Sequence, residues 1–595
     1  MKDFLKYTLA TITGIVVVCV VITIFSLLTM AGMASMGTVA ESIDDNSVMV
    51  IKLDGELTDR ASEADPISQL TGQANQTLGL KEMIAAIKNA KENDKIKGIY
   101  IETGNFAGTT PALLTELRDA LADFKTTDKF ILAYGDNYTQ GEYYLSSVAD
   151  SLVINPEGMV EWVGMAVQTM YYKKILEKVG VNMQVVKVGK YKSAVEPFML
   201  DDISDANREQ IETFSGEIWG KILADVAKSR GITAEKLNAL TDSGIVVKST
   251  EYLKAEKLVD KVAYYDEIPQ MIANMMGVNK DDYKTTTIQN VAANATNTPK
   301  SMSGDKIAVY YAEGEIVQSP SQYSFMNEDG IVGEEVIRDL KKLADDDDVK
   351  AVVMRVNSPG GSAYASEQIW HQVMNIKAKK PIVVSMGGYA ASGGYYISCA
   401  ANWIVAQPTT LTGSIGIFGT FPDVSNLVNE KLGVNVATVK TNDLSDFATP
   451  FRPFSAKEKD LMQEYINHGY DLFTRRCAEG RGLSQDSIKV IGEGRVWTGV
   501  HAIDLGLVDQ LGSLDDAIAK AKELAEIEEC TIAEYPAQKT FFEQLMEQGT
   551  NKSSYADEQL RLMLGEYYND VKTIRNVMSQ DNMQAAMPYL IKFNL

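Results

Sequence analysis

One serine, Ser392, stands inside a run of small residues at positions 385–398, SMGGYAASGGYYIS. An apolar run typical of a strand precedes it at 381–384, and a run typical of a helix follows it at 395–404. A strand, a tight turn and a helix in that order place the hydroxyl at a helix N-terminus, where backbone N–H groups favour developing negative charge. The pattern indicates a nucleophile, although a Gly/Ala-rich helix packed closely on a sheet has the same appearance.

A serine hydroxyl needs a base to become a nucleophile, and the usual base is histidine. The chain has three histidines, His371, His468 and His501, and none lies in a Gly-rich turn. A Ser-His-Asp triad is therefore not indicated, and a Ser-Lys dyad is the remaining option. Lysine at its ordinary pKa of ~10.4 is protonated at neutral pH, so it serves as a base where burial lowers that pKa toward ~7–8.

The chain contains the same unit twice. Residues 95–165 align with residues 348–417 at a constant offset of 252 positions through the part that contains the serine. The similarity continues downstream, where residues 178–199 align with residues 431–452 at an offset of 253. An internal repeat of this length indicates two copies of one folded unit.

The two copies have kept different polar residues. Ser392 aligns with Gln140, and the glycines of the SPGGS turn at 358–362 are mostly lost in the first copy. Conversely, Lys192 aligns with Ser445 and Lys190 with Asp443, so the second copy lacks both lysines. Two residues apart on a strand, these lysines would face the same side, so their spacing does not choose between them. Complementary loss predicts one composite site, with the serine from the second copy and the base from the first.

Further residues complete the predicted site. Ser414, in the turn after the next strand, is a candidate to orient the lysine. Backbone N–H groups of Gly361 and Gly393, with Gly360 as a further candidate, would form an oxyanion hole. Each such donor contributes ~3–4 kcal/mol at the transition state.

Composition limits the partners. The 80 Asp+Glu residues outweigh 57 Lys+Arg, and the net charge of −23 argues against nucleic acid or an anionic lipid surface as the main partner. The four cysteines show no zinc or disulfide spacing. We therefore expect no metal and no other cofactor.

The N-terminus predicts a membrane anchor. Residues 9–33 contain no charged side chain, and this stretch is long enough to supply the ~20 residues that cross a bilayer. A cleaved signal peptide is the alternative, but the apolar stretch is longer than a typical signal-peptide core. Lys2 and Lys6 precede the span, so the positive-inside tendency places the acidic body on the extracytoplasmic side of the cell membrane.

Strand-like runs alternate with helical patterns of 10–15 residues in each copy, as in α/β units with parallel strands and right-handed crossovers. We expect an α/β protein. Its predicted parts are a membrane anchor over 1–40, a first repeat over 41–283, a linker over 284–304, a second repeat over 305–536 and a helical tail over 537–595.

Several motifs together resemble signal peptide peptidase A, also called protease IV, in its long tandem-repeat form: the Ser392 stretch, SPGGS, TGSIGIFG and GKYKSAVEPF. The resemblance implies a Clp/crotonase-like fold in both repeats, with Ser392 as the nucleophile. It implies Lys192, rather than the nearby Lys190, as the general base and Ser414 as its hydroxyl partner. It further implies a homotetramer with the active sites inside, and remnant signal peptides as substrates. The tail after about residue 537 carries no matching motif.

We therefore expect a membrane-anchored serine endopeptidase that acts on short peptides through an acyl-enzyme. A crotonase-like acyl-CoA enzyme is the first alternative, because it shares the sheet-and-turn arrangement. Enzymes of that type are generally soluble. We expect neither a membrane anchor in them nor a serine and a lysine that come from different repeats. A non-catalytic membrane scaffold is the second alternative.

Overall fold

The computed structural model describes residues 41–61, 77–107, 109–296, 304–319, 330–537 and 583–587, with a few isolated positions before residue 22. Within these residues, none of the helices combines the length and the apolar character needed to cross a bilayer. The membrane span expected over residues 9–33 lies almost wholly outside the described part of the chain.

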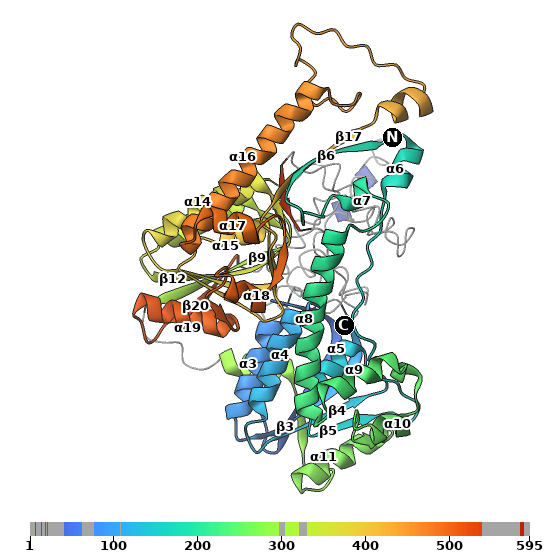
Figure 1. Ribbon diagram of the computed structural model, residues 1–595. Helices are drawn as coiled ribbons and strands as arrows, with labels where there is room; N and C mark the ends of the chain where they lie inside the picture. Colours follow the sequence, from blue (N-terminus) through green and yellow to red (C-terminus); the bar gives the residue numbers. More distant parts are fainter. Residues whose placement is uncertain are drawn as a thin grey trace.

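The first repeat is built on a seven-stranded parallel sheet of order β2-β1-β3-β4-β5-β7, with β8 pairing β1 (Figure 1). Its strands are β1 (Ser47–Thr58), β2 (Thr77–Gly79), β3 (Ile96–Ala107), β4 (Phe130–Gly135), β5 (Ser151–Ile154), β7 (Lys261–Val262) and β8 (Lys284–Thr287). Every residue of β5 is buried, as expected for a parallel sheet with both faces covered.

Helices of the first repeat connect these strands, and most of them pack on the sheet. They are α3 (Leu80–Glu92), α4 (Pro111–Phe124), α5 (Gln140–Ser146), α6 (Lys173–Val179), α7 (Glu196–Met199), α8 (Asp205–Arg230), α9 (Ala234–Asp242), α10 (Thr250–Ala255), α11 (Ile268–Met276) and α12 (Ile288–Thr296). The longest, α8, has 26 residues; the Ser204 side chain caps its N-terminus, and Gly231 ends it in the left-handed conformation.

The second repeat has an eight-stranded sheet of order β18-β16-β14-β12-β9-β20, with β15 and β19 branching from β14. Its strands are β9 (Lys306–Glu313), β12 (Val349–Ser358), β14 (Ile382–Ala391), β15 (Trp403–Ala406), β16 (Leu411–Gly413), β18 (Val496–Thr498), β19 (Gln510–Leu511) and β20 (Thr531–Tyr535). All its pairs are parallel except β16 with β18. The predicted parallel α/β arrangement is therefore present, with this local exception.

The helices of the second repeat follow the same order as those of the first. They are α13 (Gly333–Asp345), α14 (Ala363–Lys377), α15 (Gly393–Ser398), α16 (Ala456–Arg481), α17 (Gln485–Ile491), α18 (Gly499–Asp504) and α19 (Leu514–Ala525). The helix α16 matches α8 in length, with a serine N-cap, Ser455, and a left-handed C-terminal glycine, Gly482.

A third sheet joins the two repeats. It has the order β11-β10-β13-β21-β17-β6, and its strands are β6 (Asn182–Val188), β10 (Ile316–Val317), β11 (Ile331–Val332), β13 (Gly360–Ser362), β17 (Ile417–Asp423) and β21 (Gln584–Ala586). The strand β6 of the first repeat pairs antiparallel with β17 of the second over seven residue pairs, and the two lie side by side in Figure 1. This pairing brings the chain that follows β6 next to the second repeat.

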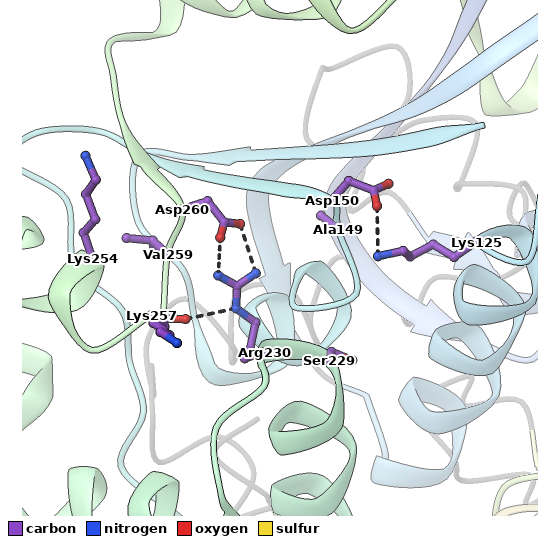
Figure 2. A pocket seen from close by; sticks show the side chains of 9 residues that line it. All are labelled: Lys125, Ala149, Asp150, Ser229, Arg230, Lys254, Lys257, Val259 and Asp260. Carbon is purple, nitrogen blue, oxygen red and sulfur yellow. Dashed lines mark hydrogen bonds and ion pairs between the residues drawn. The ribbon is translucent and has the colours of Figure 1, made fainter. Parts of the chain in front are cut away.

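One ion pair occurs in equivalent places of the two repeats. At the end of α8, Arg230 donates to both carboxylate oxygens of Asp260 at 2.7 and 3.0 Å, and Figure 2 shows this pair in the pocket that surrounds it. At the end of α16, Arg481 contacts Asp509 at 2.5 and 3.0 Å. Each aspartate also accepts the amide of a neighbouring strand. The pocket of Figure 2 is therefore lined by a structural ion pair that the repeat has kept.

A buried arginine fixes the repeats to each other. Arg355 on β12 donates to Asp59 at 2.8 Å and to Glu116 on α4 at 2.9 Å, and all three side chains are less than 5% exposed. Removing one member of a buried pair costs ~3–5 kcal/mol, because the remaining charge stays buried without its partner. The first and second repeats therefore hold a defined relative position.

Three sequence expectations are corrected. Residues 284–296, expected as linker, form β8 and α12, because Ile288 and Val291 are buried against the first repeat. The helix expected over 395–404 is only α15, because Trp403 already begins β15. Of the tail expected as helix over 537–595, the described residues 584–586 form a strand, and most of the rest lies outside the described residues.

Candidate active site

Ser392 lies in the turn between β14 and α15, as the small-residue run predicts. Its backbone adopts φ 56° and ψ −111°, a conformation that L-residues rarely adopt. The Ser392 amide donates to the Gly413 carbonyl at 2.8 Å, and the Ser392 carbonyl accepts from the Tyr396 amide at 2.8 Å. The neighbouring glycines are required by space, because a Cβ on Gly394 would lie 2.6 Å from the Ser358 carbonyl oxygen.

Lys192 reaches this serine from the first repeat. Its Nζ donates to Ser392 Oγ at 2.7 Å across 200 positions of sequence, and both residues are fully buried. Burial lowers the pKa of Lys192 well below its usual range, because a charged ammonium loses its hydration in this environment. The lysine therefore has the lowered basicity that a general base at neutral pH requires.

Ser414 holds the lysine in place. Lys192 Nζ contacts the Ser414 hydroxyl at 3.1 Å and the Ser414 carbonyl oxygen at 3.0 Å. Ser414 follows β16 with φ 49°, and its amide donates to the Arg495 carbonyl at 2.7 Å. Three oxygens, two from Ser414 and one from Ser392, thus surround the amine.

The glycines of the SPGGS turn lie beside the serine. Gly360 and Gly361 have φ 103° and φ 150°, and the amide nitrogen of Gly393 is 2.7 Å from the place that a Cβ on Gly360 would take. The Gly360 amide donates to the Ser358 hydroxyl at 3.2 Å. Gly361 and Gly393 are therefore the better candidates for an oxyanion hole, and Gly360 is not needed as a donor.

The other residues considered from sequence lie elsewhere. Lys190 is exposed, and its Nζ lies over the Tyr191 ring at 4.9 Å. The strand β6 ends at Val188, so Lys190 and Lys192 both lie beyond it, and the rule that residues two apart on a strand face the same side does not apply to them. His501 pairs with Glu217 at 2.7 Å. Among the described residues, we find no cluster of side chains suited to bind a metal ion.

Family comparisons cover both repeats. The model for peptidase family S49 matches residues 123–279 and again residues 375–528, the second match containing Ser392 and Ser414. The model for Clp protease matches residues 326–409.

The chain belongs to peptidase family S49.

Relatives in this family are similar over most of their length. Protease 4 of Haemophilus influenzae is 35% identical over 509 residues, which cover 82% of this chain and 80% of the relative. Protease 4 of Salmonella typhi is 35% identical over 562 residues, covering 92% and 88%. The chloroplastic serine protease SPPA of Arabidopsis thaliana is 31% identical over 484 residues, covering 81% and 69%.

These findings confirm the expected family, a tandem-repeat S49 member with a Clp protease-like α/β fold. They make the chain a serine protease of the S49 family. The two S49 matches also coincide with the internal repeat that was visible in the sequence alone.

Sequence reasoning missed one part of this S49 site, the loop over residues 492–495. The Glu493 carbonyl accepts the Tyr191 amide at 2.9 Å, and a Cβ on Gly494 would lie 2.7 Å from Lys192 Cβ. The same loop binds the Ser414 amide through Arg495. The only available signal was the pair of glycines in the sequence IGEGR, which does not indicate what they contact.

Proposed function

We propose that this chain is a serine endopeptidase whose nucleophile, Ser392, and general base, Lys192, come from different repeats. The observation that supports this most strongly is the 2.7 Å contact between Lys192 Nζ and Ser392 Oγ. Burial without a neighbouring carboxylate favours the neutral amine. A crotonase-like acyl-CoA enzyme needs neither this serine nor this lysine.

In the proposed reaction, the neutral amine of Lys192 accepts the hydroxyl proton while Ser392 Oγ attacks the peptide carbonyl carbon. The amides of Gly361 and Gly393 stabilise the oxyanion that forms. The Lys192 ammonium then donates its proton to the leaving amine as the C–N bond breaks, which leaves an ester on Ser392. Water, deprotonated by Lys192, hydrolyses this ester. The Ser414 carbonyl and hydroxyl oxygens stabilise the transient ammonium and hold its direction.

Two variants and a matched control test the assignment. A fluorophosphonate is expected to modify Ser392 in the wild type, and Ser392→Ala is expected to lose both modification and peptide hydrolysis. Lys192→Met is expected to lose hydrolysis with the fold intact, whereas Lys190→Met, two positions away and exposed, keeps it. Hydrolysis by either Ser392→Ala or Lys192→Met would refute the dyad. Binding of a CoA thioester without peptide hydrolysis would favour the crotonase-like alternative, and neither activity would favour a scaffold.

We also propose that the chain assembles into a homo-oligomer, consistent with the tetramer that the family resemblance implies. Within one chain, β6 of the first repeat pairs with β17 of the second. By the repeat offsets, the equivalents of these two strands are residues 435–441 and residues 165–171. Neither segment is a strand in the chain, and both contain exposed apolar residues, among them Met170 at 54% and Val439 at 99%.

In the reciprocal pairing, residues 435–441 of one copy would form a strand pair with residues 165–171 of the next. This pairing would give both segments main-chain hydrogen bonds and would repeat the β6–β17 contact around a closed ring. Val439→Asp is expected to reduce the assembly to smaller species in sedimentation velocity, whereas Lys440→Glu, next to it in sequence, serves as a charge control. An unchanged oligomer in Val439→Asp would refute this pairing.

Membrane anchoring and location complete the proposal. The uncharged residues 9–33, preceded by Lys2 and Lys6, support a single anchor with the bulk of the chain on the extracytoplasmic side. A membrane-attached peptidase of this family is suited to remnant signal peptides, which we propose as its substrates. The orientation is tested by adding a protease to cells whose outer envelope has been removed, with the cell membrane either intact or opened. If the bulk of the chain is extracytoplasmic, the chain is expected to be digested in both samples.

A further inference from the structure

One buried glutamine lies between the turn that carries the lysine and the strand that supports the serine. Gln210 is in the second turn of α8, in the first repeat, and is 1% exposed. Its side chain contacts the turn over residues 189–193 on one side and the start of β18 on the other. This glutamine therefore contacts both repeats next to the place where they form the site.

The amide nitrogen of Gln210 holds both neighbours of Lys192. Its Nε2 donates to the Tyr191 carbonyl at 3.1 Å and to the Ser193 hydroxyl at 2.6 Å. The Ser193 hydroxyl in turn donates to the Tyr191 carbonyl at 2.9 Å, so these contacts form a closed triangle. A third oxygen, Asn207 Oδ1, lies 2.9 Å from the same nitrogen. The backbone is thus held immediately before and immediately after the lysine.

The amide oxygen of Gln210 holds the strand that supports the nucleophile. Its Oε1 accepts the Val496 amide at 3.2 Å. Val496 pairs with Gly413 in the β16–β18 ladder, and the Gly413 carbonyl accepts the Ser392 amide at 2.8 Å. One side chain therefore connects the backbone of the proposed base with the backbone that positions the proposed nucleophile.

The two contacts explain why this position holds a glutamine. A backbone carbonyl only accepts and a backbone amide only donates, so a side chain between Tyr191 and Val496 needs both a donor and an acceptor at its end. An ionised glutamate has no donor, and methionine, which is similar in length, has none either. Both partners are buried, where a polar group left without a hydrogen bond is costly.

A second contact joins the same two elements nearer the surface. Arg495 donates to the Tyr191 hydroxyl at 3.1 Å and to Glu209 at 3.0 Å. The Glu209 side chain is 50% exposed, and exposed ion pairs contribute little. This contact also acts on the Tyr191 ring and not on the backbone of the turn. The buried glutamine is therefore the contact that determines where the lysine backbone lies.

We propose that Gln210 is a positioning residue that sets the distance between Lys192 and Ser392. The inference rests on the proposed Ser-Lys peptidase function. Without this amide, the turn over residues 189–193 loses its buried connection to β18, and the amine loses its 2.7 Å contact with Ser392 Oγ. The change affects proton transfer and leaves peptide binding to other residues, so kcat is expected to fall while KM stays unchanged.

The pH dependence supplies a readout that a general loss of stability would not move. Complete burial lowers the pKa of Lys192. A turn that moves away from β18 admits water to the ammonium, which raises this pKa toward its ordinary value. The midpoint of the rise of kcat/KM with pH is therefore expected to move to higher pH when Gln210 is replaced.

The test compares Gln210→Met with the control Glu212→Met in the full-length chain. Glu212 is exposed and lies two positions further along the same helix. With a fluorogenic peptide, Gln210→Met is expected to lose about 10²-fold in kcat and to show the upward shift of the pH midpoint. Glu212→Met is expected to match the wild type in kcat, KM and pH midpoint. Ser193→Ala opens the triangle but keeps Gln210, so it is expected to lose about threefold in kcat, with a smaller shift in the same direction.

Each contrary outcome has a separate meaning. Wild-type kcat in Gln210→Met would refute the positioning role and leave the proposed function standing. A fall in kcat with an unchanged pH midpoint would also overturn it, because the lysine would then have kept its buried place. If circular dichroism shows that Gln210→Met does not fold, Ser193→Ala decides, and wild-type kinetics in that variant would overturn the proposal. A wild type that hydrolyses no peptide would refute the proposed function itself.

Discussion

Gly494→Ala is expected to inactivate the enzyme, although the substitution changes neither Ser392 nor the amine of Lys192. The new Cβ would lie 2.7 Å from Lys192 Cβ, 2.7 Å from Lys192 N and 2.8 Å from its Cα. Carbon atoms in contact are normally ~3.5–4.0 Å apart, so the Lys192 backbone must move by roughly 1 Å. The 2.7 Å contact from Nζ to Ser392 Oγ has no room for this change. A displacement of this size costs about 10²-fold in kcat.

Gly482→Ala is the matched control for this variant. Gly494 and Gly482 have φ 78° and φ 64°, so alanine brings left-handed backbone strain of ~1–2 kcal/mol at either position. A Cβ on Gly482 would meet no atom within 4 Å, and this glycine ends α16 away from the site.

The assay is hydrolysis of a fluorogenic peptide, with thermal unfolding measured in parallel. Both variants are expected to lose stability through backbone strain, and Gly494→Ala is expected to lose more because of its overlap with Lys192; only Gly494→Ala is expected to lose kcat. If Gly494→Ala keeps kcat within about threefold of the wild type, a change of less than ~1 kcal/mol in the barrier, the lysine position does not limit the reaction and the reasoning is refuted.

Three more predictions concern the lysine and its surroundings. The value of kcat/KM is expected to rise with pH through the lowered pKa of Lys192 and then level off, because the neutral amine is the active form; a profile that falls over this range would contradict the role of base. Lys192→Met is expected to be more stable than the wild type at neutral pH, with a gap that narrows as pH rises toward ~10.4, because the unfolded wild type binds more protons than the folded form in that window; denaturant titrations at several pH values measure this gap. Ser414→Ala loses one hydrogen bond to Lys192 and keeps the carbonyl contact, so kcat/KM is expected to fall about tenfold, the equivalent of ~1.4 kcal/mol, and wild-type kinetics would exclude an orienting role.

The internal repeat explains why the sequence could predict so much of the site. Ser392 aligns with Gln140 and Lys192 with Ser445, so comparing the chain with itself identifies both residues without any structure. The repeat also predicts that they come from different copies. The turn at Ser392 follows from local chemistry, because only small neighbours permit its backbone conformation next to the Ser358 carbonyl.

Contacts between distant segments could not be predicted in the same way. No local pattern in the sequence of β6 identifies β17 as its partner. Likewise, position 494 must be a glycine because the backbone of Lys192, 302 positions earlier in the chain, lies against it. The strand β21 is only three residues long, and its alternation is too short to distinguish a strand from a helix. Each of these depends on tertiary pairing between the repeats or with the tail.

The central claim is that Ser392 and Lys192 act as one unit across the two repeats. The most direct measurement is kcat/KM for peptide hydrolysis by Ser392→Ala, by Lys192→Met and by the double variant, with circular dichroism to show that all three are folded. Residues that act together are non-additive, so each single variant is expected to lose as much activity as the double variant. Substantial activity in either single variant, or losses that add in the double variant, would contradict the claim.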